Sequence, residues 1–148
     1  MPGESFWDRF WVSGQANFIR QQHPTFPAAY SGANSFQPDR EHATSRIETL
    51  YTGFQLTNRL EILADIEGAG GGGLSSALGI AEFTNVDVVR NPTLGQKPYV
   101  SRVMLHYTIP LGDESTESTR NPLSLASTVP VRRLELRVGK MSTVDFST

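Results

Sequence analysis

Hydrophobic and polar side chains alternate along several stretches of the chain, and this period of two predicts β-strands. In the clearest stretch, residues 60–67, every even position is aliphatic and carboxylates stand at positions 61, 65 and 67. Residues 132–140, RRLELRVGK, repeat the pattern, with charged side chains at 133, 135 and 137 and aliphatic ones between them. Each such strand has one polar face and one apolar face.

Five segments fit this period, namely residues 10–21, 45–56, 60–67, 99–109 and 132–140. None of them repeats at the spacing of a long helix, so we expect an all-β chain of antiparallel, up-and-down strands in a single domain spanning residues 1–148. Two long loops are expected, at 22–44 and 68–98, with a three-residue turn at 57–59 between them. Long loops at one end and tight turns at the other are typical of membrane β-barrels.

Two connections carry further signals. Residues 110–130 are rich in Ser and Thr and predict a mobile connection, while residues 74–83 could form a short helix. The run Gly68–Gly73 satisfies the G-x-G-x-x-G spacing of a dinucleotide site, with Asp87 nearly twenty residues on. The preceding strand carries carboxylates, which would repel a pyrophosphate, so we expect a flexible glycine loop instead.

Alternation alone does not say which face is the core. In a soluble sheet the aliphatic face points inward, whereas in a membrane barrel it meets lipid and the charges line a water-filled lumen. The expected strands are long, and Tyr99 and Tyr107 stand near the two ends of one apolar face, where a membrane barrel carries aromatic residues. The aromatic residues at positions 6, 7, 10 and 11 suit either a core or a membrane interface.

Composition removes several classes of function. The net charge is −2 and no Lys/Arg cluster exceeds a pair, which excludes a nucleic-acid partner. Cysteine is absent, and His23, His42 and His106 lie in separate segments, so we expect neither a metal nor a cofactor. Asp65 and Glu67 could be imagined as the acid and base of a glycoside hydrolase, but charges on a strand face explain them more simply, and no enzymatic activity is expected.

Four segments, taken in order, resemble a known family. They are FPAAYSGANSF (26–36), LYTGFQLTNRLEILADIEGAGGGGLSSALGIAEF (50–83), YVSRVMLHYTIPLG (99–112) and RRLELRVGKMSTVDF (132–146). Together they resemble the amino-terminal part of the carbohydrate-selective porins, OprB type, of Gram-negative outer membranes. The resemblance implies a passive diffusion channel, built as a β-barrel in the cell outer membrane, with inward-folded extracellular loops and a constriction of charged side chains. Family members are much longer, and five strands cannot close a barrel, so the chain is expected to be a fragment.

The charged positions of the strands are the candidate pore-lining and solute-binding residues. By the resemblance, Glu67 and the pair Arg137 and Lys140 fall at strand-to-loop junctions, and Arg102 faces the lumen. The full set is Glu48, Asp65, Glu67, Arg102, His106, Arg133, Glu135, Arg137 and Lys140. The expected partners are carbohydrates or small polar solutes and outer-membrane lipid, with a homo-oligomer left open. The alternative is a soluble β-sheet carbohydrate-binding module with the aliphatic face as its core.

Overall fold

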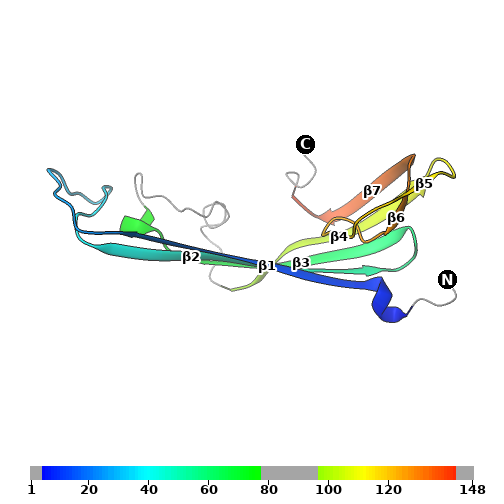
Figure 1. The fold of residues 1–148 in the computed structure, drawn as a ribbon, viewed down its shortest axis with the longest axis horizontal. Helices are drawn as coiled ribbons and strands as arrows, with labels where there is room; N and C mark the ends of the chain where they lie inside the picture. The colour runs from blue at the N-terminus through cyan, green and yellow to red at the C-terminus, as the bar shows by residue number, and fades with distance from the viewer. Residues whose placement is uncertain (1–4, 78–96, 143–148) are drawn as a thin grey trace. The chain divides into compact units, whose positions relative to one another are not determined.

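The computed structural model describes residues 5–77 and 97–142, and it confirms the expected all-β class. The elements in chain order are η1 (Phe6–Arg9), β1 (Phe10–His23), β2 (Glu41–Gln55), β3 (Leu60–Gly71), η2 (Leu74–Ala77), β4 (Tyr99–Pro110), β5 (Ser115–Glu117), β6 (Thr128–Pro130) and β7 (Arg133–Lys140) (Figure 1).

The long strands form one five-stranded sheet in the order β1-β2-β3-β4-β7, while β5 and β6 form a separate two-stranded hairpin. Strands that follow one another in the sequence are therefore neighbours in the sheet, as the up-and-down prediction requires. Among the described residues β1 and β7 are not paired with each other, so this sheet does not close into a barrel.

The chain divides into two compact units. The first unit comprises Met1–Gly14, Leu50–Ile66 and Val100–Thr148, and the second comprises Gln15–Thr49 and Glu67–Tyr99. The prediction of a single domain rested on the length of the chain, because 148 residues suit one core.

Strands β1, β2 and β3 are longer than the pattern predicted. β1 continues to His23 and β2 begins at Glu41, so the first long connection is 24–40 rather than 22–44. β3 continues to Gly71, so the expectation of a flexible loop is wrong for residues 68–71. Gly71 has φ +107°, and a Cβ there would overlap the carbonyl oxygen of Thr44. Glycine therefore serves a close backbone approach here.

The expected helix at 74–83 is replaced, where the structure describes it, by the short turn η2. Ser75, Ser76 and Ala77 have φ values of 48°, 59° and 59°, which is left-handed backbone that non-glycine residues seldom adopt. The remainder of the expected helix, and Asp87, lie outside the described residues.

The connection between β4 and β7, expected to be mobile, is a folded segment. Its hairpin pairs Ser115 with Pro130 and Glu117 with Thr128, and it lies beside β4 in Figure 1. At its neck, the Leu111 N–H donates to the carbonyl oxygen of Arg132 over 2.8 Å. The serine and threonine content suggested a mobile connection. Threonine is also common in β-strands, and a short polar segment has no hydrophobic alternation that would indicate a strand.

Candidate functional site

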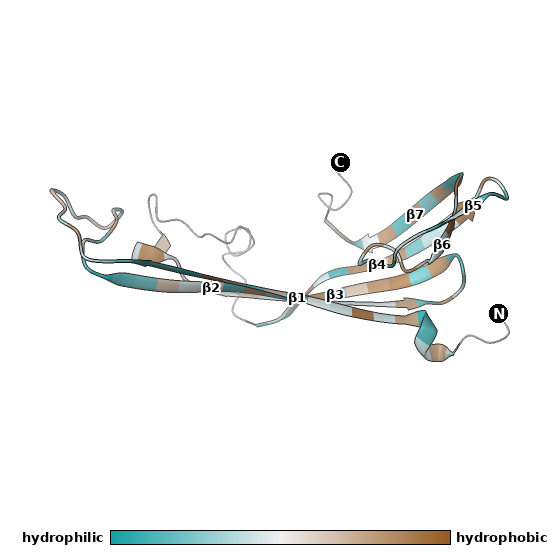
Figure 2. Cartoon of the chain, viewed as in Figure 1, coloured by the Kyte–Doolittle hydropathy of each residue, from teal (hydrophilic) through white to brown (hydrophobic). Residues whose placement is uncertain are grey.

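The first unit has two chemically different faces, set by the register of β4 and β7. On one face Leu105 lies opposite Val138 and Tyr107 lies opposite Leu136; on the other, His106 lies opposite Arg137. Figure 2 shows the resulting alternation of hydrophobic and hydrophilic positions along these strands. Pairs directly opposite one another share a face, so each face is chemically uniform across both strands.

The aliphatic face is exposed. Leu134, Leu136 and Val138 on β7 are 53%, 49% and 65% exposed. On the same face, the exposed apolar side chains of β3 and β4 are Ile62, Ile66, Val103, Leu105 and Tyr107. A contiguous apolar surface of this kind is unusual on a soluble monomer and marks a surface that meets something apolar.

The opposite face carries buried charges, beginning with the pair Asp65 and Arg102. The Arg102 Nη1 lies 3.1 Å from Asp65 Oδ2, and the Asp65 side chain is only 2% exposed. The same guanidinium nitrogen donates to the carbonyl oxygen of Pro122 over 3.2 Å. Arg102, which lies on β4, therefore contacts both β3 and the folded connection.

A second buried group lies around His106. Its Nδ1 is 3.8 Å from Glu61 Oε2 and its Nε2 is 3.6 Å from Glu135 Oε2. The Leu125 backbone N–H donates to Glu61 Oε2 over 2.6 Å. Sequence reasoning left Glu61 out of the candidate set, although Glu61 lies four residues before Asp65 on the same face of β3.

The charges of β7 are more accessible. Arg133 Nε and Arg137 Nη2 donate to the two oxygens of Glu135 over 2.5 Å and 2.6 Å. The three side chains are 33%, 24% and 22% exposed in the order Arg133, Arg137, Glu135. This row is the part of the charged face that a solute can reach in the described structure.

A leucine of the connection seals the buried part of this face. Leu125 packs with Leu63 and Met104 in a small core whose members are all at most 1% exposed. A Cβ on Gly53 would lie 2.7 Å from Leu125 Cδ1 and 2.8 Å from Leu63 Cδ2. The absence of a side chain at Gly53 thus forms a socket for Leu125, and no periodic pattern could have signalled it.

The remaining candidate residues do not join this group. In the second unit, Glu48 is exposed and lies 3.7 Å from Arg46, while Glu67 accepts a hydrogen bond from the Tyr99 hydroxyl. In the first unit, Lys140 donates to the carbonyl oxygen of Val100. Asp65 contacts Arg102 in the first unit, and Glu67 contacts Tyr99 in the second.

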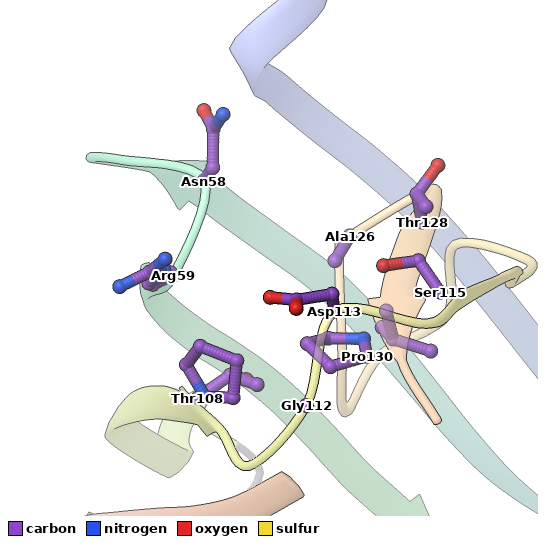
Figure 3. A pocket seen from close by; sticks show the side chains of 11 residues that line it. Asn58, Arg59, Thr108, Gly112, Asp113, Ser115, Ala126, Thr128 and Pro130 are labelled. Carbon is purple, nitrogen blue, oxygen red and sulfur yellow. The ribbon is translucent and has the colours of Figure 1, made fainter. Parts of the chain in front are cut away.

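A polar hollow of about 370 Å³ lies beside the hairpin in the first unit (Figure 3). Arg59 from the tight turn and Asp113 from the connection give it one charge of each sign. The hydroxyls of Thr108, Ser115 and Thr128 also line it. The volume is within the range of small-molecule sites, and the lining offers both hydrogen-bond donors and acceptors.

Comparison of the chain with protein-family models, with curated proteins and with solved structures gave no match. No helix of the described part of the chain has the length and hydropathy needed to span a bilayer. Nor do residues 5–77 and 97–142 contain a group of three or more His, Cys, Asp or Glu placed to hold a metal ion.

Proposed function

We propose that this chain forms part of the wall of a passive diffusion channel in the cell outer membrane, which admits carbohydrates and similar small polar solutes. The observation that carries the proposal is the inverted arrangement of the first unit. Its aliphatic face is exposed and its charged face lies beneath a folded segment, the reverse of a sheet whose aliphatic side is the core.

Lipid is the surrounding that best suits the exposed face. Apolar surface in water is unfavourable by roughly 25 cal/mol per Å², and hydrocarbon removes that cost. Strands of about 9–11 residues cross a bilayer when tilted. β3 and β4, with 12 residues each, are long enough to do so.

A wet interior is the surrounding that best suits the charged face. Burying several charges in a dry interior is costly unless each is paired and hydrogen-bonded. The accessible charges of β7, Arg133, Glu135 and Arg137, alternate in sign along the strand and are paired with one another. The accessible row of β7 and the polar hollow then offer mixed donors and acceptors to a passing polyol.

The channel needs no chemistry and no cofactor. Solutes would be selected by the width of the lumen and by the accessible charges Arg133, Glu135 and Arg137. Under this proposal Asp65, Arg102 and His106, which lie beneath the Leu125 segment, position that segment rather than contact solute. The order of motifs that resembles the carbohydrate-selective porins supports the same function.

Lipid contact can be tested with single cysteines, because the chain contains none of its own. A lipid-sensitive fluorophore at Leu136→Cys should be quenched by brominated lipid when the protein is folded into vesicles. Ser115→Cys, on the hairpin, is the matched control and should be quenched much less. Equal quenching at both positions would contradict the proposal.

Passage of solute is a separate measurement. Vesicles in which the folded protein has assembled into a closed channel should swell in isotonic monosaccharide faster than vesicles holding the heat-denatured protein. Quenching at Leu136→Cys without swelling would retain the membrane wall and overturn transport by this chain. Cooperative unfolding of a monomer in detergent-free buffer, with glycan binding there, would instead favour the soluble carbohydrate-binding module.

A further inference from the structure

A hydrogen-bonded group in the second unit ties both of its long connections to the start of β2. His23, the last residue of β1, lies 3.2 Å from the carboxylate of Glu41, the first residue of β2. The other ring nitrogen of His23, Nδ1, lies 2.8 Å from the carbonyl oxygen of Pro24. The rings of Phe26 and Phe36 pack against the imidazole at centroid distances of 5.3 Å and 4.8 Å.

Both hydrogen-bond partners of His23 are acceptors. A carbonyl oxygen and an ionised carboxylate carry no hydrogen, so the imidazole must supply the proton in each contact. Neutral imidazole has one N–H and satisfies one contact, whereas the imidazolium has two and satisfies both. The full arrangement is therefore complete only when His23 is protonated.

Glu41 holds the second connection through the left-handed turn η2. Its Oε2 accepts from the Ser75 N–H over 3.0 Å and from the Ser75 hydroxyl over 2.7 Å. The Ser75 hydroxyl in turn accepts from the Gln37 N–H over 2.9 Å. Three consecutive residues with positive φ are strained, and the carboxylate of Glu41 compensates by receiving the donors that the turn directs at it.

Glu41 stays ionised where histidine titrates. The hydrogen bond from the Ser75 hydroxyl, aided by the contact with His23, holds the pKa of Glu41 below its ordinary value of 4.5 despite some desolvation. Glu41 is the charged group that the structure places against the ring. The other neighbours are aromatic side chains and a backbone carbonyl.

We propose that His23 is a proton-operated latch. As imidazolium it donates both to the Pro24 carbonyl oxygen and to the Glu41 carboxylate, and it thereby fastens the start of the connection 24–40 to the carboxylate that also holds η2. Loss of the proton breaks one of the two contacts and frees the start of that connection. The two phenylalanine rings limit the access of water to the ring, which strengthens the charged contact. This latch lies entirely in the second unit and does not depend on the channel proposal.

Proteolysis of the full chain tests the latch. Tyr30, in the connection 24–40, is 77% exposed and offers a chymotrypsin site. Cleavage after Tyr30 should be about three- to tenfold slower in the wild-type protein than in His23→Gln near pH 5.5, the range expected for one typical intramolecular hydrogen bond. The ratio of the two rates should approach one as the pH is raised to 8, because the neutral ring supplies a single N–H. Dividing the cleavage rate of the wild-type protein by that of His23→Gln removes the pH dependence of the protease itself.

Two further variants define the latch. Glu41→Gln still offers an oxygen to Ser75, and its amide N–H can donate to the neutral ring, so the ratio of its cleavage rate to that of His23→Gln should vary little with pH. His42→Gln alters an exposed histidine on the same strand and should keep the wild-type profile. If His23→Gln does not fold, a free peptide of residues 24–40 supplies the same normalisation. A wild-type ratio that stays constant from pH 5.5 to pH 8, or a profile abolished by His42→Gln, would overturn the proposal.

Discussion

In the first unit, the two faces of strands β3, β4 and β7 differ in what covers them. On the charged face, Leu125 and its segment bury Glu61, Asp65 and His106 almost completely. On the aliphatic face, Leu134, Leu136 and Val138 stay about half exposed or more. Hydropathy alone would have predicted the opposite burial. The comparison teaches that the solvent of each face, and not only its side chains, must be inferred before a core is assigned.

The largest effect is expected at the seal of the charged face. Leu125→Ala should destabilise the protein by about 2–5 kcal/mol, because it removes buried contacts and leaves a cavity against Leu63 and Met104. Urea-induced unfolding, carried out in the medium in which the protein folds, measures the change in the free energy of unfolding. Leu111→Ala, an exposed leucine of the same connection, is the control and should change stability by no more than about 0.5 kcal/mol. Similar losses for the two variants would show that Leu125 does not seal the face.

A charge on the aliphatic face comes next. Leu136→Lys should cost about 2–4 kcal/mol when the protein is folded into a bilayer, because the ammonium must enter hydrocarbon. Thr116→Lys, an exposed position of the hairpin, is the matched control. Vesicle-based unfolding titrations compare them. If the two lysines cost the same, the aliphatic face does not meet lipid.

Filling the socket should have a smaller effect. Gly53→Ala places a Cβ against the ends of Leu125 and Leu63, and we expect a loss of about 1–3 kcal/mol from overpacking. The ends of leucine side chains can shift, which keeps the cost near the lower limit. Gly112→Ala, where a Cβ would meet no atom within 4 Å, is the control for the change of residue type. Thermal unfolding of both variants measures the difference. Equal shifts of the melting temperature would show that Gly53 does not form a socket for Leu125.

The smallest effect is expected in the accessible row. Arg133→Gln removes a guanidinium that is one-third exposed, and partly exposed ion pairs contribute no more than about 1 kcal/mol. The loss should diminish further as salt is added, because salt screens the pair. Arg132→Gln, the exposed neighbour, should show no such salt dependence. A salt-independent loss above 2 kcal/mol would mean that Arg133 is part of the buried support.

The strands and their faces could be predicted because a period of two is a local signal. It identified β3, β4 and β7 and grouped Asp65, Arg102, His106 and the β7 charges on one side. It assigned no clear face to Glu48, since β2 has polar residues on both faces, and the structure places Glu48 3.7 Å from Arg46 in the second unit. It also missed Glu61, although the alternation places Glu61 on the same face of β3 as Asp65.

Other features depend on contacts that are distant in sequence. Leu125 reaches Gly53 across more than seventy residues, and neither residue is unusual in its own segment. The left-handed turn at Ser75 likewise depends on the carboxylate of Glu41. Local propensity favoured a helix there, and tertiary hydrogen bonds decided otherwise.

The neck between Leu111 and Arg132 has a mechanical consequence. The hairpin segment leaves and rejoins the sheet at adjacent strands, whose eight residue pairs do not involve it. Lifting Leu125 out of its socket therefore requires no strand to separate, and a released segment stays tethered at high effective concentration over its docking site. The connection is thus a closed loop whose neck stays attached to adjacent strands of the sheet, whether or not Leu125 is docked.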